Sequence, residues 1–254
     1  KLVMFLHSPA DAHFFDQVLT RISVYFSSQV WADSKETLSH RVPSLNLENG
    51  RIVSFVTHRL AAPEEPRVIP SFIFWGRVHP QKGLGHALHI FAAIHAVYPA
   101  AKFSIIGPDG GDLERIQKLA ENLKLAESVT FYGGREFEEI ESLACDASFY
   151  LQTSLVEGMA MSVVEAMQLG LVPVVTPVGE IGNYCQHGEN SLLVNADQCV
   201  IDEILAVLCS QKKYSELREN AIATWADQAL YSESVLQACG ALLLDQTGES
   251  MRGL

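Results

Sequence analysis

The feature that most constrains this chain is a regular alternation of strand-like and helix-like segments that starts near residue 71. Short runs rich in β-branched and aromatic residues, such as residues 72–75 and 102–106, end in glycine, and a segment with apolar residues at helical spacing, such as residues 84–98, follows. Strands joined through helices of this length form right-handed βαβ units and a parallel sheet with helices on both faces. The sequence therefore predicts an α/β fold with a Rossmann-like, doubly wound parallel sheet.

The opening region has the same character but fewer elements. It offers about three strands and two helices, whereas a doubly wound domain usually has five or six strands. Prolines in residues 61–70 indicate a linker. We expect residues 1–65 to be the end portion of an incomplete first Rossmann-like domain, residues 66–230 to be a second Rossmann-like domain, and residues 231–254 to be a C-terminal helix and tail, frayed from residue 248 onward. An upstream part of the first domain or a partner chain would then be missing.

Composition narrows the function classes. With 48% hydrophobic and 19% charged residues, the chain is expected to be a soluble globular protein, and it has no apolar run of the roughly 18–20 residues that a membrane span needs. A net charge of −12 argues against nucleic-acid binding. The five cysteines form no CxxC pair and no metal-ligand spacing, which predicts no metal site and reduced, buried thiols in a cytoplasmic protein.

Two glutamates mark the central stretch, residues 155–173. Glu157 and Glu165 lie around a small-residue turn between an expected strand and an expected helix. Ligands of open α/β sheets collect where strand ends meet helix starts, and carboxylates there can accept hydrogen bonds from sugar or ribose hydroxyls. A simpler interpretation stands beside this one: Ser162 as the N-cap and Glu165 reaching back to it form a capping box, and Glu157 is an ordinary loop residue.

Two cations lie on an earlier strand-to-helix loop. Arg77 and Lys82 follow the strand at residues 72–75, and a planar guanidinium together with a point charge suits a diphosphate. The alternative is that both are solvated surface cations. The loop lacks the GxxxxGK[ST] pattern of a P-loop.

Several motifs together resemble one family. They are, in order, GRVHPQKG, IIGPDGG, VTFYGG, EGMAMSVVEAM, GLVPVVT and GENSLLV. In this order they resemble the nucleotide-sugar-binding half of retaining GT-B glycosyltransferases of group 1 (family 4-like). The resemblance covers about residues 72–194 and implies a GT-B fold.

The resemblance also implies roles for individual residues. Arg77 and Lys82 would hold the diphosphate of an NDP-sugar, with UDP- or GDP-sugars as the expected donors and no other cofactor. Glu165 would bind the ribose hydroxyls, Glu157 would lie against the donor sugar, and Arg135 would line the base. Backbone amides would meet the sugar and the distal phosphate along one loop, at Gly158, Met159, Ala160, Met161 and Ser162.

The opening strand resembles the family as well, since MFLHS places His7 where a histidine ends an acceptor-side strand close to the reacting sugar. A histidine with a purely structural role at a strand end is the alternative. The chain departs from the family at Met159-Ala160-Met161, where Phe-Gly-Leu is frequent, and Ala160 in place of glycine restricts the backbone there.

The implied reaction is transfer of a sugar to an acceptor hydroxyl with retention of anomeric configuration and without a metal. A carbohydrate or lipid-linked acceptor in glycan, polysaccharide or glycolipid synthesis is expected. Two alternatives remain: a non-catalytic nucleotide-sugar-binding subunit, and a sugar-nucleotide epimerase or phosphorylase on the same fold.

Overall fold

The computed structural model describes residues 2–7, 14–42, 50–64 and 67–250 and divides the chain into two compact units. The first unit combines Lys1–Arg59 with Gln228–Leu254, and the second comprises Leu60–Asp227. The C-terminal helix, which the sequence analysis set apart as a segment of its own, thus belongs to the first unit. Among the described residues, no helix combines the length and the apolar character that crossing a membrane requires.

The first unit is built on a small parallel sheet. Its three strands are β1 (Val3–Leu6), β2 (Gln29–Ala32) and β3 (Gly50–Ile52), in that order across the sheet. Its helices are α1 (Phe14–Phe26), α2 (Lys35–Arg41) and α10 (Tyr231–Ser250).

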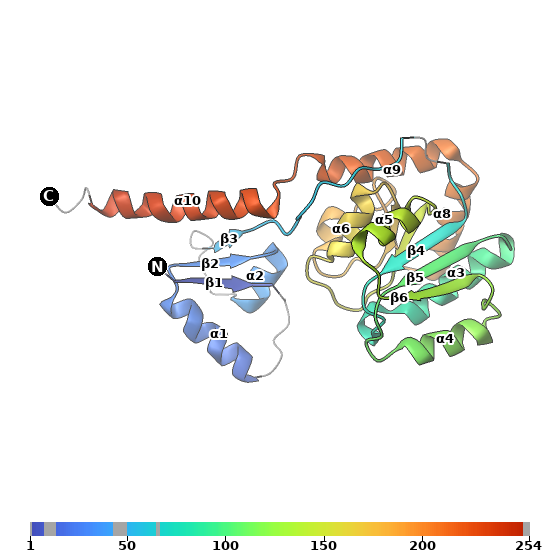
Figure 1. The fold of residues 1–254 in the computed structure, drawn as a ribbon, viewed down its shortest axis with the longest axis horizontal. Coiled ribbons are helices and arrows are strands. Elements are labelled where there is room, and N and C mark those ends of the chain that lie inside the picture. Colours follow the sequence, from blue (N-terminus) through green and yellow to red (C-terminus); the bar gives the residue numbers. More distant parts are fainter. Residues whose placement is uncertain (1, 8–13, 43–49, 65–66, 251–254) are drawn as a thin grey trace. The chain divides into compact units, whose positions relative to one another are not determined.

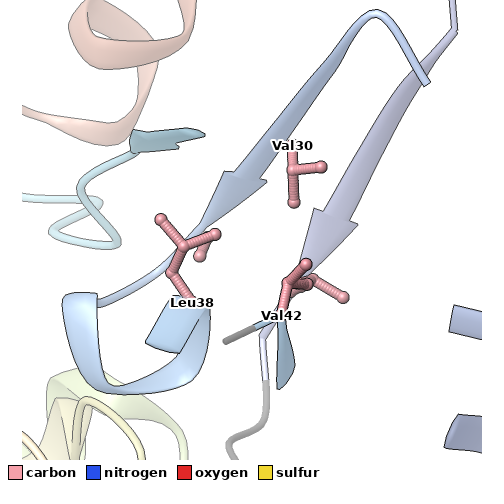
Figure 2. Packing of buried hydrophobic residues seen from close by; sticks show 5 residues of the cluster. Val30, Leu38 and Val42 are labelled. Atoms are coloured by element: carbon pink, nitrogen blue, oxygen red, sulfur yellow. The ribbon is translucent and has the colours of Figure 1, made fainter. Parts of the chain in front are cut away.

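Alternation along the strands of the first unit buries both faces of this sheet. Leu6 and Val30 pack with Leu38 and Val42, from α2 and its C-terminal end, in a cluster that Figure 2 shows from close by. On the other face, Trp31 packs with Val53 of the chain after β3 and with Ala238 of α10. Successive strand residues point to opposite faces, so Val30 and Trp31 necessarily serve different clusters.

The second unit contains a six-stranded parallel sheet with the order β6-β5-β4-β7-β8-β9, of which Figure 1 labels β4, β5 and β6. Its strand order changes direction between β4 and β7, which are hydrogen-bonded neighbours. This point is the topological switch of a doubly wound sheet, where the crevice for a ligand opens at the carboxyl ends of the strands. The strands are β4 (Ser71–Trp75), β5 (Lys102–Ile106), β6 (Val129–Gly133), β7 (Phe149–Gln152), β8 (Val172–Val175) and β9 (Leu192–Leu193).

Helices cover both faces of this sheet. Helix α3 connects β4 to β5, toward one edge of the sheet, and α6 connects β7 to β8, toward the opposite edge. Because both crossovers are right-handed, the two helices lie on opposite faces of the sheet. Accordingly α3 packs with α4 and α8, whereas α6 packs with α9. The helices are α3 (Leu84–Val97), α4 (Leu113–Asn122), α5 (Phe137–Ala144), α6 (Met161–Gln168), α7 (Ile181–Tyr184), α8 (Asp197–Leu208) and α9 (Gln211–Ala226).

The sheet core is aromatic around the switch point. Phe72 of β4 and Phe149 of β7 are register partners, and their rings stack with centroids 5.0 Å apart. Phe91 of α3 packs against this pair from one face of the sheet, with its ring centroid 5.6 Å from that of Phe72. The predicted α/β fold with a doubly wound parallel sheet is thus confirmed.

Some local expectations were wrong. The short helices η2 (Pro80–Lys82) and α7 were not predicted, because three or four residues carry too little periodicity. Helix α10 continues to Ser250, so residues 248–250 are helical, and the rest of the tail expected to be frayed, residues 251–254, lies outside the described residues. Of the five cysteines only Cys185 is buried, because the other four lie at helix ends or on exposed helix faces. These four are Cys145, Cys199, Cys209 and Cys239.

Candidate functional site

The loop after β4 carries the two predicted cations. Arg77 is exposed and lies two residues after the end of the strand, whereas Lys82 ends η2 and is partly buried. Gly83 then adopts a left-handed conformation with φ 64°, and a Cβ atom there would lie 1.9 Å from the carbonyl oxygen of Thr153. Only glycine permits this approach, which sets the Lys82 loop directly against the chain that leaves β7.

Glu157 lies on the loop after β7 and is 7% exposed. Its Oε1 atom accepts hydrogen bonds from Lys82 Nζ at 2.7 Å, Ser154 Oγ at 2.6 Å and Gln152 Nε2 at 3.1 Å. Three donors converging on one oxygen hold the carboxylate in a single orientation, and the ion pair with Lys82 stabilises its charge. Glu157 is therefore a fixed, buried anion and not an ordinary exposed loop residue.

Gln152, the last residue of β7, holds this arrangement in place through the hydrogen bonds of its side-chain amide. Its Oε1 atom lies 2.7 Å from the hydroxyl of Tyr150 and 3.2 Å from that of Ser162. Burial raises the pKa of Tyr150 well above its ordinary value, so the hydroxyl keeps its proton and can donate it. With its oxygen committed to these hydroxyls, Gln152 presents its amide N–H₂ to Glu157.

Glu165 lies in the second turn of α6, the helix that follows the Glu157 loop. Its Oε2 atom accepts a hydrogen bond from the indole Nε1 of Trp75 at 2.8 Å. Trp75 is the last residue of β4, so this bond ties the end of that strand to the helix. The two glutamates are thus each held by a partner from the carboxyl edge of the sheet.

The capping-box interpretation of the helix start was wrong. Helix α6 begins at Met161, and its N-cap is Ala160, which makes no side-chain capping bond. Ala160 adopts a left-handed conformation with φ 55°, which is uncommon for a residue with a Cβ atom. Ser162 bonds Gln152 and Glu165 bonds Trp75, so neither side chain serves as a cap.

A segment after β8 holds the loop from residue 154 to residue 160, and the sequence analysis did not find it. Gly179, with φ 58°, packs so closely that a Cβ atom would lie 2.2 Å from the carbonyl oxygen of Glu157. Three hydrogen bonds add to this contact: Thr176 Oγ1 to the Ser154 oxygen at 2.6 Å, Glu180 N to the Gly158 oxygen at 3.1 Å, and the Tyr184 hydroxyl to the Met159 oxygen at 2.9 Å. The sequence signal that could have predicted this contact is a glycine followed by a polar residue, shortly after a strand.

Two predicted residues lie elsewhere. Arg135 follows β6 and is exposed, and its Nη1 atom lies 3.7 Å from Oε1 of Glu139 on the following helix, α5. His7 follows β1 in the first unit and is exposed. The structure thus brings Lys82, Glu157 and Glu165 to one edge of the sheet, with Arg77 on the same loop as Lys82, while Arg135 follows a more distant strand of that edge.

The arrangement suits an anionic ligand that also carries hydroxyl groups. The first backbone N–H groups of α6 have no acceptor within the helix, and the helix dipole places partial positive charge at that end. Arg77 and Lys82 add two cations, and the glutamates offer acceptors for hydroxyls. No cluster of three or more histidine, cysteine, aspartate or glutamate side chains suited to a metal ion occurs among residues whose positions are described.

Comparisons with known proteins identify relatives of this chain. The GPI3 subunit of phosphatidylinositol N-acetylglucosaminyltransferase from Saccharomyces cerevisiae is 27% identical over 149 residues, which is 59% of this chain and 32% of that protein. GDP-mannose:cellobiosyl-diphosphopolyprenol alpha-mannosyltransferase from Komagataeibacter xylinus is 27% identical over 155 residues, or 60% of this chain and 38% of the relative. The chain thus spans about a third of the length of these relatives.

The crystal structure of Anabaena HepE in complex with UDP-glucose is similar with a TM-score of 0.79 and 21% identity, covering 95% of this chain and 71% of HepE. This likeness shows a fold of the GT-B glycosyltransferase type. The family model described as "Glycosyl transferases group 1" matches residues 59–224, which include every strand and helix of the second unit up to most of α9. The chain belongs to the group 1 glycosyltransferases.

Proposed function

We propose that the second unit binds a nucleoside diphosphate sugar at the switch point between β4 and β7. Arg77 and Lys82 hold the diphosphate, Glu165 accepts hydrogen bonds from the ribose hydroxyls, and Glu157 lies against the sugar. The observation that carries the proposal is the convergence of Lys82, Glu157 and Glu165 at the carboxyl edge of two neighbouring strands, although 75 and 83 positions separate the lysine from the glutamates. Such an edge is where doubly wound sheets bind nucleotides.

The remaining assignments follow from the path of the chain. The backbone N–H groups from Gly158 to Ser162, at the start of α6, meet the sugar and the distal phosphate. Arg135 lies after β6, toward one side of the sheet, and is proposed to line the base. His7, at the end of β1, is proposed to approach the reacting sugar from the acceptor side.

The proposed reaction moves the sugar to an acceptor hydroxyl with retention of anomeric configuration. Arg77, Lys82 and the start of α6 stabilise the negative charge that grows on the leaving diphosphate, which is the role a metal plays in other enzymes. The reaction is therefore proposed to proceed without a metal, so EDTA should leave the rate unchanged. Proton NMR of the first product formed would give its anomeric configuration.

Similar proteins narrow the choice of donor and acceptor. A relative that is named for GDP-mannose and a structure solved with UDP-glucose support UDP- or GDP-sugars as donors. Relatives named for a phosphatidylinositol and a diphosphopolyprenol acceptor support a lipid-linked or carbohydrate acceptor. The cytoplasmic location expected from the cysteines stays a prediction.

A thermal-shift panel with UDP, GDP, ADP, CMP and dTDP at millimolar concentration tests the donor site. A ligand that binds only the folded protein raises its stability by about RT ln(1 + [L]/Kd), so one nucleotide should stand out. Arg77→Ala and Glu165→Ala should each weaken its binding by about 1–3 kcal/mol, the usual cost of a lost charged hydrogen bond. Lys118→Ala, on the exposed surface of α4, is the control. Unchanged affinity in both site variants would contradict the assignment.

Turnover separates the rival functions. An epimerase would isomerise or hydrolyse the nucleotide sugar without an acceptor hydroxyl, and a phosphorylase would need inorganic phosphate to cleave a glycoside. A non-catalytic subunit would bind the nucleotide sugar and convert nothing. A transferase consumes the donor only when an acceptor is added, apart from slow hydrolysis.

We also propose that further protein covers part of the first unit, either an upstream part of that domain or a partner chain. Strand β1 pairs with β2 alone among the strands described, and α1 leaves Phe15, Leu19 and Phe26 exposed at 74%, 61% and 69%. Apolar surface of this extent normally marks an interaction site. The chain should therefore bind the dye ANS, and a longer protein with upstream sequence should bind less of it.

A further inference from the structure

One contact at the candidate donor site joins two elements that are far apart in the sequence. The indole Nε1 of Trp75 donates to Glu165 Oε2 at 2.8 Å, across 90 positions of sequence. An indole N–H can only donate, and a carboxylate has about four acceptor positions, of which Trp75 takes one. A hydrogen bond to an ionised acceptor is both short and directional.

The surroundings of Trp75 leave its ring little freedom. It is 5% exposed, and it packs edge-on against Tyr150 with ring centroids 4.6 Å apart and planes at 70°. Tyr150 is itself completely buried and bonded through its hydroxyl to Gln152. The direction of the Trp75 N–H is therefore set by the sheet core before any ligand arrives.

We propose that Trp75 is a positioning residue of the donor site, whose indole N–H holds the Glu165 carboxylate in the orientation that accepts hydrogen bonds from the ribose hydroxyls of a nucleoside diphosphate. This inference rests on the proposed function, because it deepens the role given there to Glu165. Without the bond, the carboxylate loses a directional donor that fixes its orientation, and restoring that orientation becomes part of the cost of binding.

The chain supplies a matched control in Trp225. Its indole N–H also donates to a residue of α6, Met167 Sδ, at 3.2 Å, and Trp225 is likewise buried at 6% exposure. Replacing either tryptophan by phenylalanine removes one buried indole bond to the same helix. If Trp75 merely fastened α6 to the fold, both replacements would act alike, whereas a role through Glu165 distinguishes them.

The first test compares two ligands by calorimetry on the whole chain: the nucleoside diphosphate that stabilises wild type most, and inorganic pyrophosphate, which has no ribose. Trp75→Phe should weaken nucleotide binding about tenfold, as expected for a lost hydrogen bond to a charged group, and leave pyrophosphate binding unchanged. Trp225→Phe should change neither. In a Glu165→Gln background, Trp75→Phe should cost much less than in wild type, because the charged acceptor is already gone.

A second measurement observes the Trp75 N–H directly by NMR. The protein has three tryptophans, so its ¹⁵N-labelled form gives three indole N–H resonances, which replacement by phenylalanine assigns. The Trp75 resonance should move in Glu165→Gln and on addition of the nucleotide, and should move much less with pyrophosphate.

Each other outcome overturns the inference. Wild-type nucleotide affinity in Trp75→Phe, equal losses for nucleotide and pyrophosphate, or an equal loss in Trp225→Phe would show that Trp75 does not act through Glu165. If wild type binds none of the nucleoside diphosphates, the proposed function fails and the inference fails with it. The wild-type panel alone therefore tells the two failures apart.

Discussion

The ion pair between Lys82 and Glu157 gives a quantitative test of the site geometry in the absence of ligand. The two side chains are 18% and 8% exposed, and their charged atoms lie 2.7 Å apart. Lys82→Met keeps the aliphatic stem but removes one of three donors to Glu157 Oε1, leaving Ser154 and Gln152. The carboxylate then stays buried with its charge no longer balanced.

We expect Lys82→Met to lower the free energy of unfolding by about 2 kcal/mol. A lost hydrogen bond to a charged group costs about 1.5–3 kcal/mol, and breaking a fully buried pair costs about 3–5 kcal/mol. Because Lys82 keeps some access to water, we expect the cost to lie in the lower of these two ranges. In a domain of this size, a loss of 2 kcal/mol lowers Tm by about 4–8 °C.

The assay is a double-mutant cycle by urea denaturation. In a Glu157→Gln background the acceptor is neutral, so Lys82→Met should then cost less than about 0.5 kcal/mol. Lys118→Met, which breaks the exposed pair with Glu114, should cost no more than about 0.5 kcal/mol in either background. If the costs of the Lys82 and Glu157 replacements simply add, the two side chains are not coupled and the reasoning is refuted.

Three further predictions concern other parts of the second unit. Gly179→Ala should lower the free energy of unfolding by more than about 2 kcal/mol and abolish nucleotide binding, because the added Cβ would collide with the carbonyl oxygen of Glu157. The control is Gly188→Ala, at φ 75° with nothing within 4 Å of the added Cβ, which should lower it by only about 1 kcal/mol. Burial raises the pKa of Cys185 to about 12. A thiol reagent at pH 8 should therefore modify the four exposed cysteines of the native protein, and Cys185 only after denaturation. Modification of all five at equal rates would contradict this. The backbone N–H groups of Gly111 and Leu113 hold the pKa of Asp109 below its usual value. This carboxylate therefore stabilises the folded state at pH values above its pKa in the unfolded chain, and the stabilisation is lost as the pH falls through its lower pKa in the folded state. Between about pH 2 and 5, the Tm of Asp109→Asn should thus depend less on pH than the Tm of wild type.

Much of this protein follows from local patterns that need no tertiary information. The alternation of apolar strands, glycine-bounded turns and helices with 3.6-residue periodicity predicts the doubly wound sheet, because each element must bury one face or both. The same alternation places Arg77, Lys82, Glu157 and Glu165 after strands, and the carboxyl ends of parallel strands share one edge. The family resemblance follows from the order of the same motifs.

Only the tertiary structure decided which side chains meet at that edge. The pairs Lys82–Glu157 and Trp75–Glu165 join positions 75 and 90 residues apart, and no sequence pattern specifies contacts across such separations. The capping box failed for this reason: locally, Ser162 and Glu165 suit a helix cap, but Gln152 and Trp75 bind them instead. The role of Gly179 was hidden because a glycine in a loop shows its necessity only when the neighbouring carbonyl group is in place. Local energetics determined the elements of this protein, and packing across the switch point determined the site.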